Sequence, residues 1–256
     1  MRLSDKAALI TGAGSGIGLG CAQAYAREGA RVALVDIDAE AGEAAAQSIR
    51  DAGGQAVFLY GDVTEEESIQ RVVEKAAGAW GRIDVLISNA GIGGRRLGDG
   101  PVHLCTLEAW EKIMRVNLTG TFLVCKAVIP GMLARGSGSI ITISSVLGMV
   151  GTQGLFDTHA YTASKAGIIG LTRAIATQYA RSGLRANTIA PGLVDTRMAA
   201  RTKADPALLD QVAFWQPLGP LGAVSDVVSA AVFLGSDEAR FITGVVLPVD
   251  GGWTAQ

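Results

Sequence analysis

The chain has 256 residues with a formal net charge of −2, and 49% of its residues are hydrophobic while only 5% are aromatic. This length is enough for one domain with a large aliphatic core, and no change in composition marks a second domain. The low charge gives no electrostatic reason to bind nucleic acid or a membrane surface, and the polar start and short apolar runs predict neither a signal peptide nor a membrane span.

Short apolar runs alternate along the chain with longer segments that favour helices. The predicted strands are Ala7–Ile10, Arg31–Val35, Ala56–Tyr60, Val85–Ser88, Ser139–Ile143, Arg185–Ile189 and Val245–Leu247. Several are apolar throughout, which is typical of strands covered by helices on both faces. Among the helices between them, Leu19–Glu28 is rich in alanine, and Glu65–Trp80 has Thr64 as its expected N-cap. This alternation predicts a single α/β domain over residues 1–256: a doubly wound Rossmann fold with a seven-stranded parallel sheet flanked by helices.

A glycine-rich segment directly follows the first predicted strand. Gly12, Gly16 and Gly18 are spaced as GxxxGxG, and the strict GxGxxG spacing is not met. Residues without a Cβ let the backbone approach a pyrophosphate, whose charge the N-terminus of the next helix stabilises. Such a segment can also be a purely structural turn, but its place in the first βα unit favours a dinucleotide site.

Asp36 ends the second predicted strand, 18 residues after Gly18. A carboxylate at this place accepts both hydroxyl hydrogens of an adenosine ribose and repels a 2′-phosphate. Ser15 and Ile37 supply no cation to offset that repulsion. The expected cofactor is therefore NAD. The alternative interpretation of Asp36 is a solvated acid at the end of a strand, with no role in binding.

Tyr161 and Lys165 are four residues apart and lie on one face of a helix if that segment is helical. A neighbouring ammonium and a positively charged nicotinamide would lower the pKa of the phenol from its ordinary value of about 10. The phenol could then exchange a proton with a substrate hydroxyl near neutral pH. Taken alone, the pair could equally be surface residues of an amphipathic helix.

Together these segments resemble the short-chain dehydrogenase/reductase family across nearly the whole chain. The matching segments are Thr11–Gly18, Asn89–Gly91, Asn117, Ser144-Ser145, Tyr161–Lys165, Pro191-Gly192 and Val249–Gly252. The resemblance implies an NAD-dependent enzyme that transfers a hydride between the cofactor and a small secondary alcohol or ketone. It also implies a homotetramer, for which the apolar segment Leu118–Leu133 is the expected interface helix.

The resemblance implies a role for each of four catalytic residues. Tyr161 would be the acid/base, and Lys165 would lower its pKa and hold the nicotinamide ribose. Ser145 would hydrogen-bond the substrate oxygen, and Asn117 would hold a water that links Lys165 to solvent. Because 16 residues separate Ser145 from Tyr161, more than is usual in the family, Ser144 remains the alternative.

The resemblance also implies a cofactor site built from the ends of successive strands. In it, Asp62 and Val63 would line the adenine, Pro191 and Gly192 would flank the nicotinamide, and the segment from Val194 to Thr196 would hold its carboxamide. The expected cofactor-binding residues are Gly12, Ser15, Gly16, Ile17, Gly18, Asp36, Ile37, Asp62, Val63, Asn89, Ala90, Gly91, Tyr161, Lys165, Pro191, Gly192, Val194 and Thr196.

Two long loops, Ile92–Pro101 and Gly148–His159, together with a capping segment at 193–217, are expected to form the substrate pocket. Phe156 and Trp215 offer it apolar surface, and His159 is a pocket residue, part of a plain loop or a proton shuttle. Four nearby arginines are expected to face solvent, which favours a neutral, moderately bulky secondary alcohol, including cyclic ones. They are Arg95, Arg96, Arg197 and Arg201.

Two other functions remain open from the sequence. One is an NADPH-linked reductase of 3-oxoacyl thioesters, although Asp36 argues against NADPH as the cofactor. The other is a dinucleotide-binding regulator without turnover, although such a protein would not need the Tyr161–Lys165 pair. Three widely spaced cysteines predict neither a disulfide framework nor a metal site, and they fit a cytoplasmic protein. They are Cys21, Cys105 and Cys125.

Overall fold

The computed structural model describes residues 1–151 and 156–256. Its seven strands form one parallel sheet in the order β3-β2-β1-β4-β5-β6-β7. The strands are β1 Ala7–Thr11, β2 Arg31–Asp36, β3 Gln55–Tyr60, β4 Val85–Ser88, β5 Gly138–Ile143, β6 Leu184–Pro191 and β7 Val246–Val249. The order reverses between β1 and β4, which makes a crevice for ligands at the carboxyl ends of these strands. The predicted doubly wound fold is confirmed.

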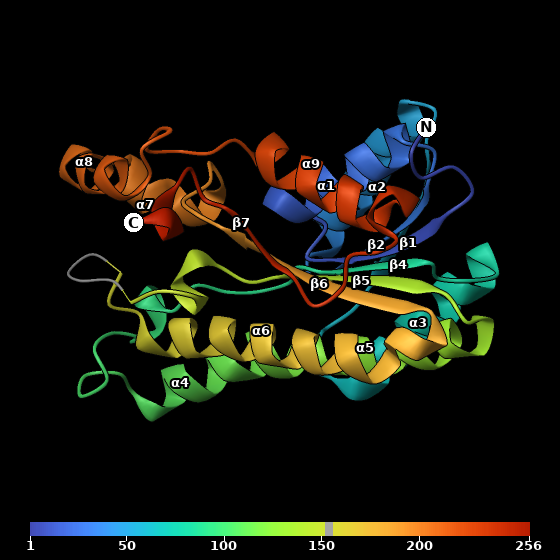
Figure 1. Cartoon of the computed structure of the whole chain (residues 1–256), viewed down its shortest axis with the longest axis horizontal. Helices are drawn as coiled ribbons and strands as arrows, with labels where there is room; N and C mark the ends of the chain where they lie inside the picture. Colours follow the sequence, from blue (N-terminus) through green and yellow to red (C-terminus); the bar gives the residue numbers. More distant parts are fainter. Residues whose placement is uncertain (152–155) are drawn as a thin grey trace.

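Helices cover both faces of the sheet (Figure 1). On one face lie α1 Gly16–Arg27, α2 Ala39–Asp51 and α9 Val224–Gly235. On the other lie α3 Glu66–Trp80, α4 Leu107–Met114, α5 Gly120–Arg135 and α6 His159–Tyr179. Two short helices, α7 Ala200–Lys203 and α8 Pro206–Trp215, lie beyond one end of the sheet, near the C-terminus.

The sheet separates two apolar cores. Ile10 and Leu34 belong to the core under α1, α2 and α9, and their strand neighbours Leu9 and Val35 belong to the core under α3, α5 and α6. All four side chains are fully buried. This is why the strands read as continuous apolar runs: successive side chains point to opposite faces, and both faces are covered.

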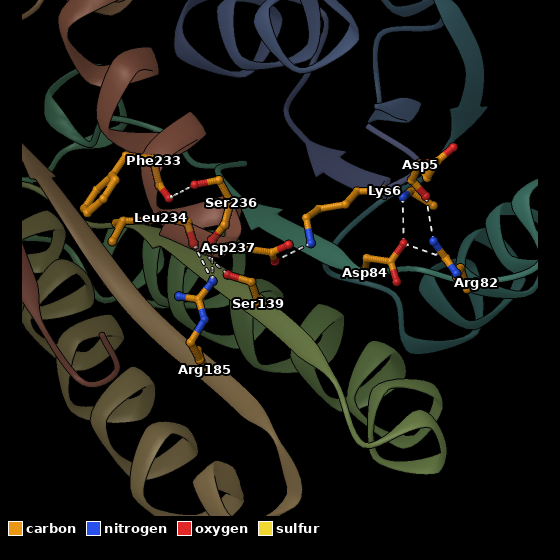
Figure 2. Close-up of polar contacts among 11 residues, drawn as sticks. Asp5, Lys6, Arg82, Asp84, Ser139, Arg185, Phe233, Leu234, Ser236 and Asp237 are labelled. Carbon is orange, nitrogen blue, oxygen red and sulfur yellow. Dashed lines mark hydrogen bonds and ion pairs between the residues drawn. The ribbon is translucent and has the colours of Figure 1, made fainter. Parts of the chain in front are cut away.

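The amino ends of the strands are joined by polar contacts (Figure 2). Asp84, just before β4, accepts hydrogen bonds from Arg82 Nε and from the backbone N of Ala7 in β1, both at 2.8 Å. Arg185 in β6 donates to the carbonyl oxygen of Leu234 at the end of α9, at 2.8 Å. These charged side chains at the amino ends of the strands thus form structural contacts that hold strands and helices together.

Several predicted boundaries differ from the observed ones by one to three residues. The N-cap at Thr64 is wrong: α3 begins after Glu65, and Thr64 Oγ1 instead bonds Asp62 Oδ1 at 2.8 Å in a turn that also holds the Thr64 backbone N. Helix α1 begins at Gly16, three residues before the predicted start, because glycines obscure its first turn. The last strand begins at Val246 instead of Val245.

The predicted apolar helix Leu118–Leu133 is part of a longer helical run, Leu107–Arg135. A π-helical turn at Arg115–Thr119 joins α4 to α5 within it. In the described part of the chain, this run alone is long and apolar enough to cross a membrane, and half of its most apolar window is buried. Its packing against the sheet and against α3 and α6 accounts for its apolar composition.

Candidate active site

The glycine-rich loop between β1 and α1 is packed tightly against the end of β4. A Cβ on Gly12 would lie 2.9 Å from the Cα of Ala90, and a Cβ on Gly18 would lie 2.1 Å from the carbonyl oxygen of Gly12. Gly16 has a φ of +56°, a conformation that favours glycine. The three glycines of the motif are therefore required by the loop's own packing, and the loop presents the N-terminus of α1 to the crevice.

Asn89 and Ala90 fasten β4 to this loop. Asn89 Nδ2 donates to the carbonyl oxygens of Thr11 and Gly12 at 3.0 and 3.1 Å. Thr11 Oγ1 accepts the backbone N–H groups of both Asn89 and Ala90. The side chain of Asn89 is thus committed to positioning the loop.

Asp36, the last residue of β2, points its carboxylate at the same loop. Its Oδ2 accepts the backbone N–H of Gly14 at 2.8 Å, and its Oδ1 accepts that of Asp38 at 3.0 Å. These two bonds fix the carboxylate beside the glycine loop, while the neighbouring Ile37 is 59% exposed. The Asp36 carboxylate therefore lies beside the glycine-rich loop.

The predicted adenine residues follow β3. Asp62 Oδ1 holds the backbone N and the hydroxyl of Thr64, both at 2.8 Å. Val63 is buried, and a Cβ on Gly120 would lie 2.8 Å from its Cγ2. Val63 therefore anchors this loop on α5.

Tyr161 and Lys165 lie one turn apart in α6, and the Lys165 ammonium is 5.5 Å from the centre of the Tyr161 ring. Lys165 Nζ donates to the carbonyl oxygen of Ile143, the last residue of β5, at 2.9 Å. Burial lowers the pKa of Lys165 to about 8. Burial also raises the pKa of Tyr161 to about 12, although the hydrogen bond with Ser145 acts in the opposite direction. In the protein alone the pKa of the phenol is therefore raised, because desolvation outweighs the hydrogen bond; the expected lowering includes the charge of a bound nicotinamide.

The two serines after β5 do different things. Ser144 Oγ donates to the carbonyl oxygen of Lys165 at 2.7 Å, so Ser144 attaches the strand to α6. Ser145 Oγ accepts the backbone N of Leu147 at 3.2 Å, and Ser145 is the serine whose side chain acts to lower the pKa of Tyr161. The geometry thus brings Ser145, the residue chosen from the motif, to the phenol.

Asn117 is fully buried in the π-helical turn between α4 and α5. Its Oδ1 accepts the backbone N of Ile92 at 2.8 Å, and its Nδ2 donates to the carbonyl oxygen of Ile92 and to Ser164 Oγ, both at 3.1 Å. A Cβ on Gly91 would lie 3.2 Å from Asn117 Oδ1 and 3.5 Å from Lys165 Nζ. Asn117 therefore joins the end of β4, the π-turn and α6 beside Lys165. Single π-turns are frequent at functional sites, and no sequence pattern indicated this one.

The segment after β6 is held by a residue that the sequence did not single out. Gln216 is 2% exposed, its Oε1 accepts the backbone N of Leu193 at 2.7 Å, and its Nε2 donates to the carbonyl oxygen of Gly219 at 3.0 Å. A Cβ on Gly192 would lie 2.3 Å from Gln216 Oε1. Gln216 thus ties the end of the capping segment to the turn after Pro191, the last residue of β6. No motif contains it; a polar residue amid an apolar stretch was its only signal.

Val194 and Thr196 lie at the start of the capping segment. Val194 is buried and forms an isolated parallel bridge with Gly222. Thr196 approaches the glycine loop, since a Cβ on Gly16 would lie 3.5 Å from its Cγ2. The predicted nicotinamide residues and the predicted pyrophosphate loop therefore meet.

Three aromatic side chains pack beside Tyr161. The ring centres of Trp215 and Trp253 are 5.1 Å apart, and that of Phe156 is 5.6 Å from Trp253 and 6.1 Å from Trp215. Tyr161 packs against the same apolar cluster, which also includes Leu147. Trp253, near the end of the chain, was not predicted; its side chain reaches the cluster only because the chain returns to this end of the sheet after β7.

Of the four arginines predicted near the pocket, one is ion-paired and three are exposed. Arg95 forms an ion pair of 2.6 Å with Asp157, which bridges the two predicted pocket loops. The other three predicted arginines are exposed. His159 is also exposed, and it is the first residue of α6, so its interpretation as part of a plain loop is wrong. Part of the predicted loop Gly148–His159, residues 152–155, lies outside the described residues.

The chain matches known proteins along almost its whole length. A family model described as enoyl-(acyl carrier protein) reductase matches residues 12–254. The cis-4-hydroxycyclohexanecarboxylate dehydrogenase of Sinomonas cyclohexanicum is 40% identical over 252 residues, which are 98% of this chain and 98% of that protein. The chain belongs to the short-chain dehydrogenase/reductase family.

Solved structures of similar proteins support this membership. The structure of levodione reductase has a TM-score of 0.92 and 33% identity, and the match covers 99% of both chains. A protein from Beutenbergia cavernae described as an NAD(P)-dependent gluconate 5-dehydrogenase, with NADP bound at low occupancy, has a TM-score of 0.91 and 38% identity, over 100% of this chain and 99% of that one.

Members of the short-chain dehydrogenase/reductase family bind a nicotinamide dinucleotide. The residues of this chain fit such a group, since a glycine loop presents a helix N-terminus, and Asp36 lies beside it with both oxygens held. Anions are stabilised at helix N-termini, so the pyrophosphate has a suitable place between Gly12 and α1.

Proposed function

We propose that this protein is an NAD-dependent dehydrogenase of neutral cyclic secondary alcohols, which also reduces the corresponding ketones. The observation that carries the proposal is the position of Tyr161. The Ser145 side chain acts to lower the pKa of its phenol, the Lys165 ammonium lies 5.5 Å from the centre of its ring, and the ring packs against the apolar cluster that contains Phe156, Trp215 and Trp253. A polar acid/base beside an apolar wall suits a ring that carries one hydroxyl.

In the proposed mechanism, bound NAD supplies the hydride acceptor, and the protein's own residues manage the proton. Ser145 donates a hydrogen bond to the alcohol oxygen, and Tyr161 removes the hydroxyl proton. The charge of Lys165 and of the oxidised nicotinamide would lower the pKa of the phenol from its raised value in the protein alone. Asn117 would hold the water through which Lys165 exchanges protons with solvent.

For cofactor binding, we assign the pyrophosphate to the glycine loop and the adenosine ribose to Asp36. The nicotinamide would lie between Pro191-Gly192 and the segment from Val194 to Thr196. We propose NAD over NADP because the Asp36 carboxylate would face a 2′-phosphate. The NADP in the Beutenbergia cavernae protein makes this choice the first one to test.

Asp36→Ala should narrow the preference for NAD, chiefly by improving NADP binding. The measurement is kcat/KM for both cofactors in the wild type and the variant, with Asp51→Ala, an exposed acid at the end of α2, as the control. An unchanged ratio of the two specificity constants would place cofactor choice elsewhere.

A cyclic substrate is supported by the aromatic cluster and by the cyclohexane ring in the name of the Sinomonas cyclohexanicum relative. That name also contains a carboxylate. In this chain Arg95 is paired with Asp157, and the remaining loop arginines are exposed, so we favour a neutral ring over an anionic one.

The experiment that tests the function follows NADH formation with cyclohexanol, 4-hydroxycyclohexanecarboxylate and an acyclic secondary alcohol, and NAD(P)H consumption with a 3-oxoacyl thioester. We expect the highest kcat/KM with the neutral ring. Preference for the carboxylate would change the substrate class, and turnover of the thioester alone would favour the second candidate. That candidate rests on the acyl carrier protein in the description of the matching family model. Cofactor binding with no turnover of any substrate would leave a non-catalytic regulator.

We further propose that residues 1–256 act as one domain with 193–217 as its substrate cap, and that four copies assemble in the cytoplasm. The cap is supported by Gln216, which fastens one end of it to the turn after β6. The assembly is supported by large apolar side chains along α4 and α5 that are unusually exposed. They are Leu107 at 70%, Trp110 at 38% and Phe122 at 46%.

A further inference from the structure

The helix that carries Tyr161 does not cap its own N-terminus. Thr158 occupies the N-cap position of α6, but its side chain makes no capping hydrogen bond. The first bond within the helix runs from the N–H of Thr162 to the carbonyl oxygen of Thr158, at 3.0 Å. The preceding N–H groups therefore need acceptors from outside the helix.

A distant loop supplies all of these acceptors. Asp99 Oδ1 accepts the backbone N–H of Ala160, and Asp99 Oδ2 accepts that of Tyr161, both at 3.0 Å. The carbonyl oxygen of Gly100 accepts the N–H of His159 at 3.2 Å. Two consecutive residues, about sixty positions earlier in the chain, thus complete the start of the catalytic helix.

The loop is shaped to deliver this carboxylate. Gly98 has a φ of +95°, and a Cβ on Gly94 would lie 2.3 Å from Asp99 Oδ2. The backbone N of Asp99 donates to the carbonyl oxygen of Gly94 at 3.1 Å, which closes a compact turn. Asp99 is only 6% exposed, so its orientation is fixed by packing as well as by hydrogen bonds.

The position of Asp99 at the start of α6 also explains how its carboxylate can be buried. Both Asp99 oxygens accept backbone N–H groups at the positive end of the α6 dipole, and Cys105 Sγ lies 3.7 Å from Oδ1. At the other end of the same loop, Ile92 is held by Asn117 through two hydrogen bonds. The loop therefore connects the residue beside Lys165 to the backbone of Tyr161.

We propose that Asp99 is a positioning residue for the reaction: by capping α6 it fixes the backbone of Tyr161, and thereby places the phenol against Ser145 and Lys165. This inference rests on the proposed acid/base role of Tyr161. Asp99 itself is not a motif residue, because it lies in a loop without a recognisable pattern. An amide at this position would accept from only one of the two N–H groups and would direct its own N–H atoms at the other.

The first test is kinetic. Asp99→Asn should lower kcat at least tenfold while the dissociation constant for NAD stays within twofold, because the cofactor residues are untouched. Its solvent deuterium isotope effect on kcat should rise, since a displaced phenol slows proton transfer. Asp99→Glu, which keeps two carboxylate oxygens, should recover part of the rate. The matched control is Asp226→Asn, which removes a carboxylate from the first turn of α9, where Asp226 Oδ2 accepts the N–H of the N-cap residue Ala223 at 2.8 Å.

The second test does not depend on turnover. In protein labelled with 13C at tyrosine Cζ, the Tyr161 resonance is assigned by its loss in Tyr161→Phe. Because burial raises the pKa of Tyr161 to about 12, the wild type and Asp226→Asn should show a protonated phenol at about pH 11. In Asp99→Asn the displaced phenol should reach water and show the phenolate shift at that pH.

The two tests separate the possible failures. An inactive wild type would refute the proposed function, but the Tyr161 resonance would still decide the role of Asp99. Wild-type kcat together with an unshifted resonance in Asp99→Asn would overturn the inference. An equal loss of rate in Asp226→Asn would also overturn it, because the effect would then be one of general stability. If Asp99→Asn does not fold, Asp99→Glu carries both measurements, with a smaller loss of rate and a partial shift expected.

Discussion

Lys165 is buried and Tyr161 is partly buried, and the loss of solvent changes their pKa values in opposite directions. The pKa of the phenol rises to about 12 and that of the ammonium falls to about 8. In both cases the neutral form is favoured, because a charge is poorly solvated there. Additional positive charge in the site would favour the phenolate, and the proposed cofactor would bring it.

Tyr161→Phe should lower turnover about a hundredfold or more while NAD binding is kept, because only the proton carrier is lost. Steady-state rates and quenching of protein fluorescence by NAD measure the two effects. Tyr179→Phe, a tyrosine in the last turn of the same helix, is the control. Turnover near the wild-type level in Tyr161→Phe would contradict the proposed mechanism.

Lys165→Met tests the buried ammonium through stability. The pKa of Lys165 is about 8 in the folded protein against an ordinary value of 10.5, so the unfolded chain binds the proton more strongly between these pH values. Its unfavourable contribution is therefore complete below pH 8 and is relieved as the pH rises toward 10.5. We therefore compare the free energy of unfolding of the wild type with that of Lys165→Met at two pH values. The difference, wild type minus variant, should increase by about 2 kcal/mol from about pH 7.5 to about pH 9.5.

Denaturant unfolding of both proteins at the two pH values makes this measurement. Burial raises the pKa values of Cys21 and Cys125 to about 12, so their contributions to stability fall as the pH rises. Both proteins contain these thiols, and their contributions therefore cancel in the difference. A difference between the two proteins that stays constant with pH would show that Lys165 has its ordinary pKa in the folded state.

The residues that the sequence predicted are those whose chemistry is fixed by motif spacing. Asp36, Ser145 and Tyr161 lie at strand ends or on a helix face, where local pattern determines their position. Asp99 and Gln216 could not be predicted, because each acts through backbone groups of segments far away in the chain. Their partners are set by how the loops pack, and no local pattern contains that information.

At the scale of elements, the strands were the best-predicted part of the fold. Their apolar runs follow directly from burial on both faces, as in Leu9 and Ile10 of β1. Helix starts were harder: Thr64 bonds Asp62 instead of capping α3, and glycines conceal the first turn of α1. The π-turn at Arg115–Thr119 had no signal in the local sequence, and its residue Asn117 bonds Ile92 and Ser164, which lie far away in the chain.

Two glycines in helices should respond to alanine in opposite ways. Gly18→Ala places a Cβ 2.1 Å from the carbonyl oxygen of Gly12, so it should destabilise the protein by about 1–3 kcal/mol and weaken NAD binding. Gly78→Ala in α3 meets nothing within 4 Å and should stabilise the protein by about 0.5–1 kcal/mol without changing NAD binding. Denaturant midpoints and NAD titrations of both variants give the comparison; an equal response would mean that the loop adapts.

For the whole molecule, alternation of strands and helices was enough to predict the sheet, because right-handed crossovers leave few arrangements for parallel strands. The sequence did not show how the two ends of the sheet differ. Lys6, Asp84 and Arg185 at the amino ends are engaged in structural contacts (Figure 2), whereas the glycine loop and Tyr161 lie at the carboxyl ends.

The proposed assembly predicts a particle about four times the 26.3 kDa chain mass in light scattering. Phe122→Glu, on the exposed side of α5, should shift the particle to a smaller one without unfolding the chain, since the side chain is 46% exposed. A wild-type mass of one chain at micromolar concentration would refute the assembly. An unchanged tetramer in Phe122→Glu would place the interface on another face.

The position of Trp253 has a practical consequence for handling the protein. The two termini lie at opposite ends of the molecule (Figure 1), with Arg2 paired to Glu238 beside the structural end of the sheet. At the other terminus, Gln256 Nε2 donates to the carbonyl oxygens of Phe214 and Trp215, directly behind the aromatic cluster. A purification tag fused after Gln256 would begin beside the residues that carry the aromatic cluster. A tag placed before Met1 would lie at the opposite end of the molecule and would leave the aromatic cluster unchanged.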